Sequence, residues 1–293
     1  MSFLIIVFIL VLVPHIVLGR VITKNEGVVF GQTYNPTWGG NHLVSLNQGN
    51  EILLTMDNYS GAGFASKMTY GSGFFHMRIK VPGSDSAGVV TAYYLTTLGK
   101  LHEEMDFEFL GNRIGKPYIL QTNVFANGVG NREHKIHLWF DPTIDFHDYK
   151  ILWNAHQIVF YVDNIPIRVY KNNTNIGASY PSNAMQIQIS LWNGEDWATE
   201  GGKAKINWNY APFKAYFQGF DVSGCPSLNP NLVDPKCFNG NFWWNNQNYW
   251  QLNPQEEKQL ENIKKNYVIY DYCTDRKRYP TPPHPTPPIE CLH

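Results

Sequence analysis

The sequence predicts an all-β fold, an antiparallel β-sandwich or barrel, over about residues 30–222. Short runs rich in Val, Ile, Tyr and Phe recur through this region, and Gly, Asn and Pro turns separate them. Runs of this length with regular turns are typical of antiparallel sheets. The chain has 293 residues and 43% hydrophobic content, so it can bury a sizeable core in one large or two modest domains.

Eight segments carry strand signals and one late segment carries a helix signal. The expected strands are residues 73–81, 88–96, 103–110, 118–126, 135–140, 149–153, 158–162 and 185–192. Asn253 can cap a helix, Pro254 suits its first position and Glu256 completes a capping box, so we expect a helix to about residue 266. Six prolines within residues 279–288 predict an extended tail.

The first nineteen residues resemble a secretory signal peptide. An unbroken apolar run covers residues 3–14, and the segment ends on the small residue Gly19. A signal anchor is the alternative, favoured by the uncharged start, but the run is short for a membrane span. We therefore expect a signal peptide at 1–19, a β domain at 20–222 and a C-terminal extension at 223–293, with no membrane attachment after cleavage.

Four cysteines lie in the last quarter of the chain. An even number in a secreted chain indicates disulfides, and of the three connectivities we prefer neighbour pairing. The pairs would be Cys225 with Cys237 and Cys273 with Cys291. Their spacing does not match a CxxC zinc site, so no metal is expected.

Composition narrows the classes of partner. The net charge is -1 and Lys and Arg are scattered, so the sequence has no electrostatic footprint for nucleic acid or an anionic membrane. Aromatic residues make up 15% of the chain, with nine Trp and 17 Tyr, and such rings serve as core or as flat platforms for sugars. A neutral partner fits this composition, and nothing in it calls for an organic cofactor.

Residues 102–111 hold four acidic side chains within six positions. Read with a period of two, His102, Glu104, Asp106 and Glu108 point to one face of a strand. The other face carries Glu103, Met105, Phe107 and Phe109. One face is therefore apolar, and the other presents three carboxylates.

The spacing of these carboxylates suits retaining glycoside chemistry. Residues four apart on a strand lie roughly 13 Å apart along the backbone. The side chains of Glu104 and Glu108 can each reach about 4 Å toward the other, which leaves the carboxyl groups near the roughly 5 to 5.5 Å that a double displacement needs. Asp106 can bridge them. Three carboxylates on one face cannot all ionise cheaply, so at least one pKa should rise and supply the acid.

Two other interpretations of this strand compete with catalysis. Acidic residues are common on a solvated sheet face, but like charges along one face repel and add nothing to folding, which favours a purpose. Oxygen ligands also suit calcium or magnesium, yet the segment lacks the Gly-bearing loop of an EF-hand. An HExxH zinc helix would need His at position 106, which is Asp.

The stretch H-E-E-M-D-F-E-F-L-G resembles the H-D-E-I-D-F-E-F-L-G motif of the xyloglucan endotransglucosylase/hydrolase family of plant cell walls, with eight of ten positions matching. That family belongs to the laminarinase-like clan of retaining β-glucanases, and the resemblance runs from Tyr34 to Cys291. It implies a jelly-roll sandwich with a concave cleft. It also implies that Glu104 is the nucleophile, Asp106 its helper and Glu108 the general acid/base. Glu103 departs from the motif on the core-facing side, where a carboxylate should be paired or at a wet edge.

The resemblance extends to residues expected to contact sugars. Side-chain amides offer both donors and acceptors to hydroxyls, and indole rings can stack on sugar rings. Arg132 is equally compatible with a structural role, and without the family Arg278 would read as a solvated charge. The expected substrate-binding residues are Glu108, Gln121, Thr122, Asn123, Asn131, Arg132, Glu133, Trp192, Asp196, Trp197, Gly201 and Arg278.

The resemblance implies cleavage of the xyloglucan backbone with retention, and transfer of the new reducing end to another xyloglucan chain. Its partners would be donor and acceptor xyloglucan, and the protein would be a monomer secreted to the plant cell wall and apoplast. The short loop 193–202 resembles the transferring members. The alternatives are a mainly hydrolytic xyloglucanase and a non-catalytic glucan-binding sandwich.

Glycosylation is one point of departure from the family. Asn58 and Asn172 begin sequons, which indicates surface positions. Many relatives carry a further sequon just after the acidic strand, but here Ile114 removes the one that Asn112 would begin.

Overall fold

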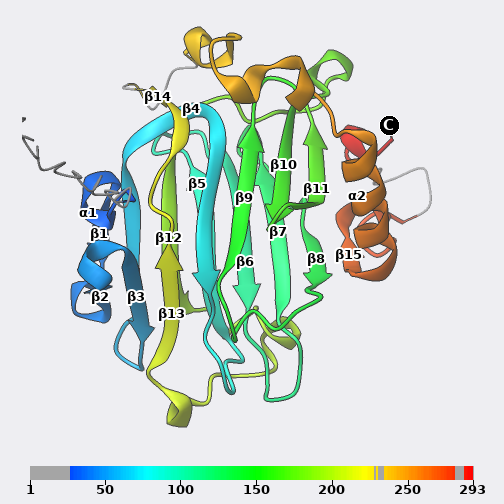
Figure 1. Cartoon of the computed structure of the whole chain (residues 1–293). Helices are drawn as coiled ribbons and strands as arrows, with labels where there is room; N and C mark the ends of the chain where they lie inside the picture. The colour runs from blue at the N-terminus through cyan, green and yellow to red at the C-terminus, as the bar shows by residue number, and fades with distance from the viewer. Residues whose placement is uncertain (1–26, 228, 230–233, 281–286, 293) are drawn as a thin grey trace, which may run out of the picture.

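This computed structural model describes residues 27–227, 229, 234–280 and 287–292 (Figure 1). Within them lie fifteen strands and two α-helices, joined by loops and short 3-10 turns. The strands are β1 (Tyr34–Trp38), β2 (Leu43–Leu46), β3 (Glu51–Met56), β4 (Ala62–Lys80), β5 (Val89–Thr96), β6 (Glu104–Leu110), β7 (Ile119–Phe125), β8 (His134–His137), β9 (His147–Trp153), β10 (Gln157–Val162), β11 (Ile165–Lys171), β12 (Met185–Asn193), β13 (Phe213–Gln218), β14 (Ser223–Ser227) and β15 (Val268–Asp271). The helices are α1 (Phe30–Thr33) and α2 (Pro254–Asn266).

The long strand β4 joins two β layers. Its first half pairs with β1 and β12, and its second half pairs with β9 and β13. The site layer runs β1, β4, β12, β5, β6, β7, β8 and β15, and the outer layer contains the rest of β4 with β9, β10, β11, β13, β3 and β2. All of these pairings are antiparallel. The predicted antiparallel sandwich is confirmed.

The apolar face of β6 anchors the acidic strand in the core. Met105, Phe107 and Phe109 are fully buried between the layers. The ring of Phe107 meets that of Phe160 edge-on at 5.2 Å, and the ring of Phe109 meets that of Tyr149 at 4.6 Å. Because side chains alternate along a strand, this burial turns the three carboxylates to the opposite face. The predicted period of two is confirmed.

The eight predicted strands are all present, although two boundaries are wrong. The strand predicted to begin at residue 73 begins at Ala62. The strand predicted at 135–140 ends at His137, because Trp139 and Phe140 leave the sheet and pack edge-on against each other at 5.5 Å. The sequence signals also missed β1 to β3, the first half of β4, β11 and the three last strands. Several of these segments are rich in polar residues or Gly, and their strand character depends on pairing with distant partners.

The C-terminal extension is tied to both layers. Asn253 accepts hydrogen bonds from the backbone of Gln255 and Glu256, so the predicted capped helix is confirmed as α2. In Figure 1 this helix lies beside β11 and β15. The disulfides join Cys225 to Cys237 and Cys273 to Cys291, as expected. The proposed domain boundary, between residues 222 and 223, lies at the start of β14, which pairs with β4.

Two expected features fall partly or wholly outside the described residues. These are the signal peptide at 1–19 and most of the proline-rich tail, residues 281–286. Within the described residues, neither helix has the length and apolar character that crossing a membrane requires.

Candidate active site

The three carboxylates of β6 line a hollow of about 200 Å³ on the exposed face of the site layer. In register, Glu108 lies between Ala92 of β5 and Gln121 of β7, while Asp106 lies between Tyr94 and Asn123. The lining residues are Ala92, Tyr94, Glu104, Asp106, Glu108, Ser190 and Trp192. The structure therefore brings the predicted catalytic residues together in one place.

Glu104 lies at the start of β6, beside a histidine. Burial raises the pKa of its carboxyl, while His102, at 3.3 Å, and a hydrogen bond with Asp106 act to lower it. The ring of His102 is itself fixed by stacking on Phe125 at 4.5 Å. These partners favour the ionised form that a nucleophile requires.

Asp106 is the most enclosed of the three carboxyls, with 4% of its surface exposed. Burial raises its pKa well above the usual range, and the charges of Glu108 and Glu104 add to the shift. Its Oδ1 has no hydrogen-bond partner among the described residues. A protonated Asp106 can donate a hydrogen bond to Glu104, which fits the predicted helper role.

Glu108 has the environment of a general acid. Burial raises its pKa to about 7, and the charge of Glu104 contributes, although a hydrogen bond from Gln121 acts in the opposite direction. Gln121 Nε2 donates to Glu108 Oε2 at 2.6 Å, so the acid is held in one orientation. Below about pH 7 Glu108 is therefore protonated, as the general acid of retaining hydrolysis and transfer must be.

Sequence reasoning missed a buried arginine beneath the site. Arg168 of β11 is 2% exposed and reaches across the core to the site layer. It donates to the carbonyl and hydroxyl of Thr122 at 2.8 and 3.0 Å, and to the carbonyl of Arg132 at 2.6 Å. Its charge lowers the pKa of Asp106, against the other influences there. A basic residue inside a short apolar strand, between Ile167 and Val169, was the available signal.

On one side of β6 the expected sugar contacts form what we call the amide flank: Gln121, Asn123, Glu133 and Arg278. Asn123 Oδ1 accepts from two backbone amides, which leaves its Nδ2 without a partner among the described residues. Arg278 donates to Glu133 at 2.8 Å and to the carbonyl of Asn131 at 3.0 Å. Amide and guanidinium donors therefore gather next to the acid.

Two predicted contacts on this side are taken up by the scaffold. Thr122 is fully buried, because its side chain alternates to the core side of β7 and accepts from Arg168, so the expectation that it contacts substrate is wrong. Arg132 is 6% exposed; it pairs with Glu290 and donates to the carbonyls of Val129 and Gly130. The geometry favours the structural interpretation of Arg132.

On the other side of β6 lies the loop that follows β12. The rings of Trp192 and Trp197 are 6.1 Å apart and tilted, with Trp192 on the rim of the hollow. Asp196 is exposed and pairs with Lys205 at 2.8 Å. Gly201 has a φ of +66° and open space where a side chain would project, so this turn needs glycine and leaves room for a ligand.

The core-facing carboxylate of Glu103 is paired with backbone amides. It is 3% exposed, and its Oε2 accepts from the backbone of Ser182 and Asn183 at 2.9 and 2.8 Å. The expected pairing is confirmed. This carboxylate ties the start of β6 to the segment that leads into β12.

The two sequons differ in accessibility. Asn58 is exposed in the turn between β3 and β4. The amide of Asn172 donates to the carbonyl of Ala155 at 2.8 Å, and its oxygen accepts from the backbone of Thr174. The amide nitrogen of Asn172, where a glycan would be attached, is thus engaged with the backbone, so the structure favours the exposed Asn58 as the acceptor.

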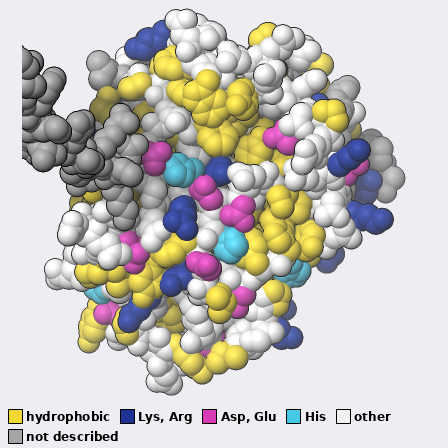
Figure 2. All heavy atoms as spheres, in the orientation of Figure 1, with side chains coloured by type: hydrophobic (Ala, Val, Ile, Leu, Met, Phe, Trp, Pro, Cys, Tyr) yellow, Lys and Arg dark blue, Asp and Glu magenta, His cyan; other side chains and the backbone are white. Residues whose placement is uncertain are grey.

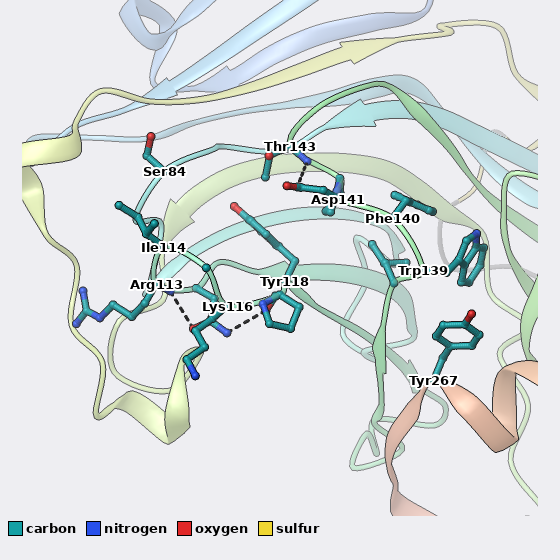
Figure 3. A pocket seen from close by; sticks show the side chains of 15 residues that line it. Ser84, Arg113, Ile114, Lys116, Tyr118, Trp139, Phe140, Asp141, Thr143 and Tyr267 are labelled. Carbon is teal, nitrogen blue, oxygen red and sulfur yellow. Dashed lines mark hydrogen bonds between the residues drawn. The ribbon is translucent and has the colours of Figure 1, made fainter.

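A larger hollow of about 690 Å³ lies between the loop after β6 and the segment after β8 (Figure 3). Tyr118, Trp139 and Tyr267 contribute rings to its wall, but no pair of carboxylates faces it. Asn112, which would begin the family's sequon, donates here to the carbonyl of Pro117 at 2.9 Å. This hydrogen bond closes the loop. The candidate catalytic residues therefore lie in the smaller hollow on β6 and not in this one.

Charged side chains of both signs also occur outside the two hollows. Acidic, basic and histidine side chains are interspersed on the face shown in Figure 2, and the pairs of the outer layer include His76 with Asp148 at 3.2 Å. No group of three or more His, Cys, Asp or Glu side chains suited to a metal occurs among the described residues.

Comparison with known proteins identifies the family of the chain. The model of "Glycosyl hydrolases family 16" matches residues 30–210, and that of "Xyloglucan endo-transglycosylase (XET) C-terminus" matches residues 238–291. Xyloglucan endotransglucosylase/hydrolase protein 2 of Arabidopsis thaliana is 58% identical over 265 residues, covering 89% of each chain. Xyloglucan endotransglucosylase/hydrolase protein A of Phaseolus angularis is 51% identical, covering 86% of each.

Solved structures match the fold at lower identity. A Bacillus licheniformis β-glucanase aligns with a TM-score of 0.51 at 24% identity, covering 64% of this chain and 89% of that one. The transglycosylase Crh5 aligns with a TM-score of 0.53 at 21% identity, covering 67% and 79%. These likenesses show the fold, and the family models and sequence relatives give one assignment: the chain belongs to glycosyl hydrolases family 16 and, within it, to the xyloglucan endotransglucosylase/hydrolase family.

Proposed function

We propose that the protein cleaves the β-1,4-glucan backbone of xyloglucan with retention and transfers the cleaved chain to a second xyloglucan molecule. The observation that carries the proposal is the hollow on β6, where an ionisable Glu104 and a Glu108 with a pKa of about 7 share one face. The names of the similar proteins, which are xyloglucan endotransglucosylase/hydrolases, supply the polysaccharide.

The roles follow from retaining chemistry. Glu104 attacks the anomeric carbon while Glu108 donates its proton to the leaving oxygen, so a covalent glycosyl-enzyme forms and the leaving chain departs. The ionised Glu108 then takes a proton from an incoming sugar hydroxyl, whose oxygen displaces Glu104. Asp106 holds Glu104 through their hydrogen bond. Gln121 and Asn123 would bind hydroxyls on the amide flank, and Trp192 with Trp197 would stack on sugar rings.

Transfer and hydrolysis share the glycosyl-enzyme and differ in the molecule that resolves it, so the binding of an acceptor decides the outcome. The short loop that carries Trp197 and Gly201 supports transfer. We also propose secretion to the plant cell wall as a monomer. The apolar first residues and the two disulfides support secretion, because disulfides persist in oxidising compartments.

One incubation tests the proposal. Xyloglucan is mixed with a fluorescently labelled xyloglucan oligosaccharide and the enzyme, and the label is followed by size-exclusion chromatography. Entry of label into the polymer is expected. A fall in polymer size without label entry would show hydrolysis instead, and binding with neither change would show a non-catalytic glucan-binding sandwich.

A further inference from the structure

A row of directly opposed residues crosses the site layer from the acid to the edge strand β1. Glu108 faces Ala92, Ala92 faces Ser190, and Ser190 faces Gly63. Gly63 in turn faces Trp38, the last residue of β1, where the register shifts after Pro36. Opposed residues in regular antiparallel pairs project to the same face of a sheet, so the row from Glu108 to Gly63 shares one face, and the packing of Trp38 decides on which face its ring lies. Trp38 therefore lies in line with the acid, four strand spacings or about 19 Å away.

The packing around two glycines confirms the face on which the indole lies. A Cβ on Gly63 would come within 2.4 Å of Trp38 Nε1, and one on Gly61 within 3.3 Å of Trp38 Cη2. Gly63 is opposed to Ser190, which lines the hollow, so a side chain at Gly63 would project to that same face. The indole therefore covers these glycines on the substrate side of the layer.

The turn after Trp38 holds the ring in place. Gly39 has a φ of +64°, and a Cβ there would come within 2.1 Å of the carbonyl of Gly61. Three glycines thus allow one indole to lie flat on β4, while 43% of its surface stays exposed. The side chain of Trp38 makes no hydrogen bond with other described residues, which leaves its Nε1 to solvent or a ligand.

The residues between Trp38 and the acid form a low, uncharged floor. Gly63, Ser190 and Ala92 are small, and the next positions along β12 and β5 carry the larger rings of Trp192 and Tyr94. A floor of small residues bordered by rings leads from the carboxylates to an exposed indole. This arrangement suits a flat, neutral polymer and offers nothing to a charged one.

We propose that Trp38 is a stacking platform for a sugar ring of the glucan chain that is bound at Glu104 and Glu108, several sugar units from the bond that is cleaved. The inference rests on the proposed function, because it takes its ligand from the same neutral polysaccharide. It adds a binding site at the far end of the floor, which only a chain long enough to cross β5, β12 and β4 can reach.

Substrate length tests this site. Initial rates are measured for wild type and Trp38→Ala with short xyloglucan oligosaccharides and with long chains. Loss of one stacking surface should raise the KM for long chains by about tenfold and leave the KM for short oligosaccharides unchanged. Trp38→Phe should retain most of the preference for length because it keeps a flat ring. Trp38→Leu, which covers the glycines without a ring, should behave like Trp38→Ala.

Trp250→Ala is the matched control, since Trp250 is 44% exposed in the C-terminal extension and stacks on His156. It should keep the wild-type dependence on length, and thermal unfolding should show that all variants fold. The inference is overturned if Trp38→Ala and Trp38→Leu keep the wild-type ratio of long to short KM, or if Trp250→Ala loses it equally. A folded wild type that acts on no xyloglucan of any length would overturn the proposed function, and the inference with it.

Discussion

The two flanks of the acidic strand present different kinds of side chain and are held in place by different contacts. The amide flank, defined above, presents amides and a guanidinium. The opposite side, which we call the indole flank, consists of Trp38, Trp192 and Trp197 beside a floor of small residues. Regular pairing of β5, β12 and β4 builds that floor. The amide flank instead depends on residues brought from the C-terminal extension.

Long-range contacts carry the amide flank. Arg132 meets Glu290 across 158 residues of sequence, and Glu290 precedes Cys291 in the second disulfide. The pairing of β15 with β8 places Arg278 over Glu133. The difference teaches that the sheet alone can supply stacking surfaces and amides, whereas the guanidinium of Arg278 needed an added segment to fix it.

The largest expected effect is the loss of turnover when Glu104, which lies on β6 between the flanks, is replaced. This loss should not depend on either flank. Glu104→Gln removes the nucleophile while keeping its size, so turnover should fall by more than about a thousandfold with both long and short substrates. Glu103→Gln, its neighbour on the core side, should lose less than about tenfold in turnover. Rates measured by the label-entry assay for both variants give the comparison. Equal losses of turnover in the two variants would contradict the assignment of catalysis to one face of β6.

The alkaline limb of activity should report the amide flank. Burial holds the pKa of Glu108 at about 7, and the protonated form is the acid, so kcat/KM should fall about tenfold per unit as pH rises beyond 7. Gln121 lowers this pKa through its hydrogen bond, so Gln121→Leu should move the limb to higher pH. The measurement is the pH dependence of kcat/KM for Gln121→Leu. An alkaline limb at the same pH as in the wild type would show that Gln121 does not influence the pKa of Glu108.

The two disulfides offer a matched test of the flanks. Replacing Cys273 and Cys291 together by Ser should reduce the free energy of unfolding by about 3 kcal/mol and raise KM about threefold, because the chain that holds Arg132 is released. Replacing Cys225 and Cys237 should cost similar stability without changing KM. Chemical denaturation and initial rates measure both. A KM change of equal size in the two variants would contradict the link to the amide flank.

The smallest expected effect concerns the buried cation beneath that flank. Arg168 lowers the pKa of Asp106, so Arg168→Met should raise that pKa further, in addition to a loss of stability. An NMR titration of the Asp106 carboxyl measures the shift. Arg168→Lys restores the charge without the paired donors, so it should restore the wild-type titration of Asp106 while remaining less stable. If neither variant changes this titration, Arg168 has a structural role alone.

Local patterns predicted much of the fold and the centre of the site. Alternation along β6 placed the carboxylates on one face, and Asn253 with Pro254 marked the helix, because these signals depend on neighbours in sequence. The roles of Trp38 and Arg168 were not predicted, because each depends on strands and contacts that lie far along the chain. An arginine in sequence indicates a solvated charge, and only the assembled layers show that Arg168 crosses the core. Thr122 was wrongly expected to contact substrate, because the expectation came from the family resemblance and ignored that Thr122 alternates with Gln121 and Asn123 along the strand.

The central claim is that Glu104 carries the glycosyl group. The enzyme is mixed with xyloglucan in the absence of added acceptor, quenched in acid and digested, and the peptides that span β6 are analysed by mass spectrometry. We expect a glycosylated peptide whose modified residue is Glu104, and its disappearance when an acceptor oligosaccharide is added before quenching. Attachment at Glu108, or a glycosyl group that no acceptor removes, would contradict the account.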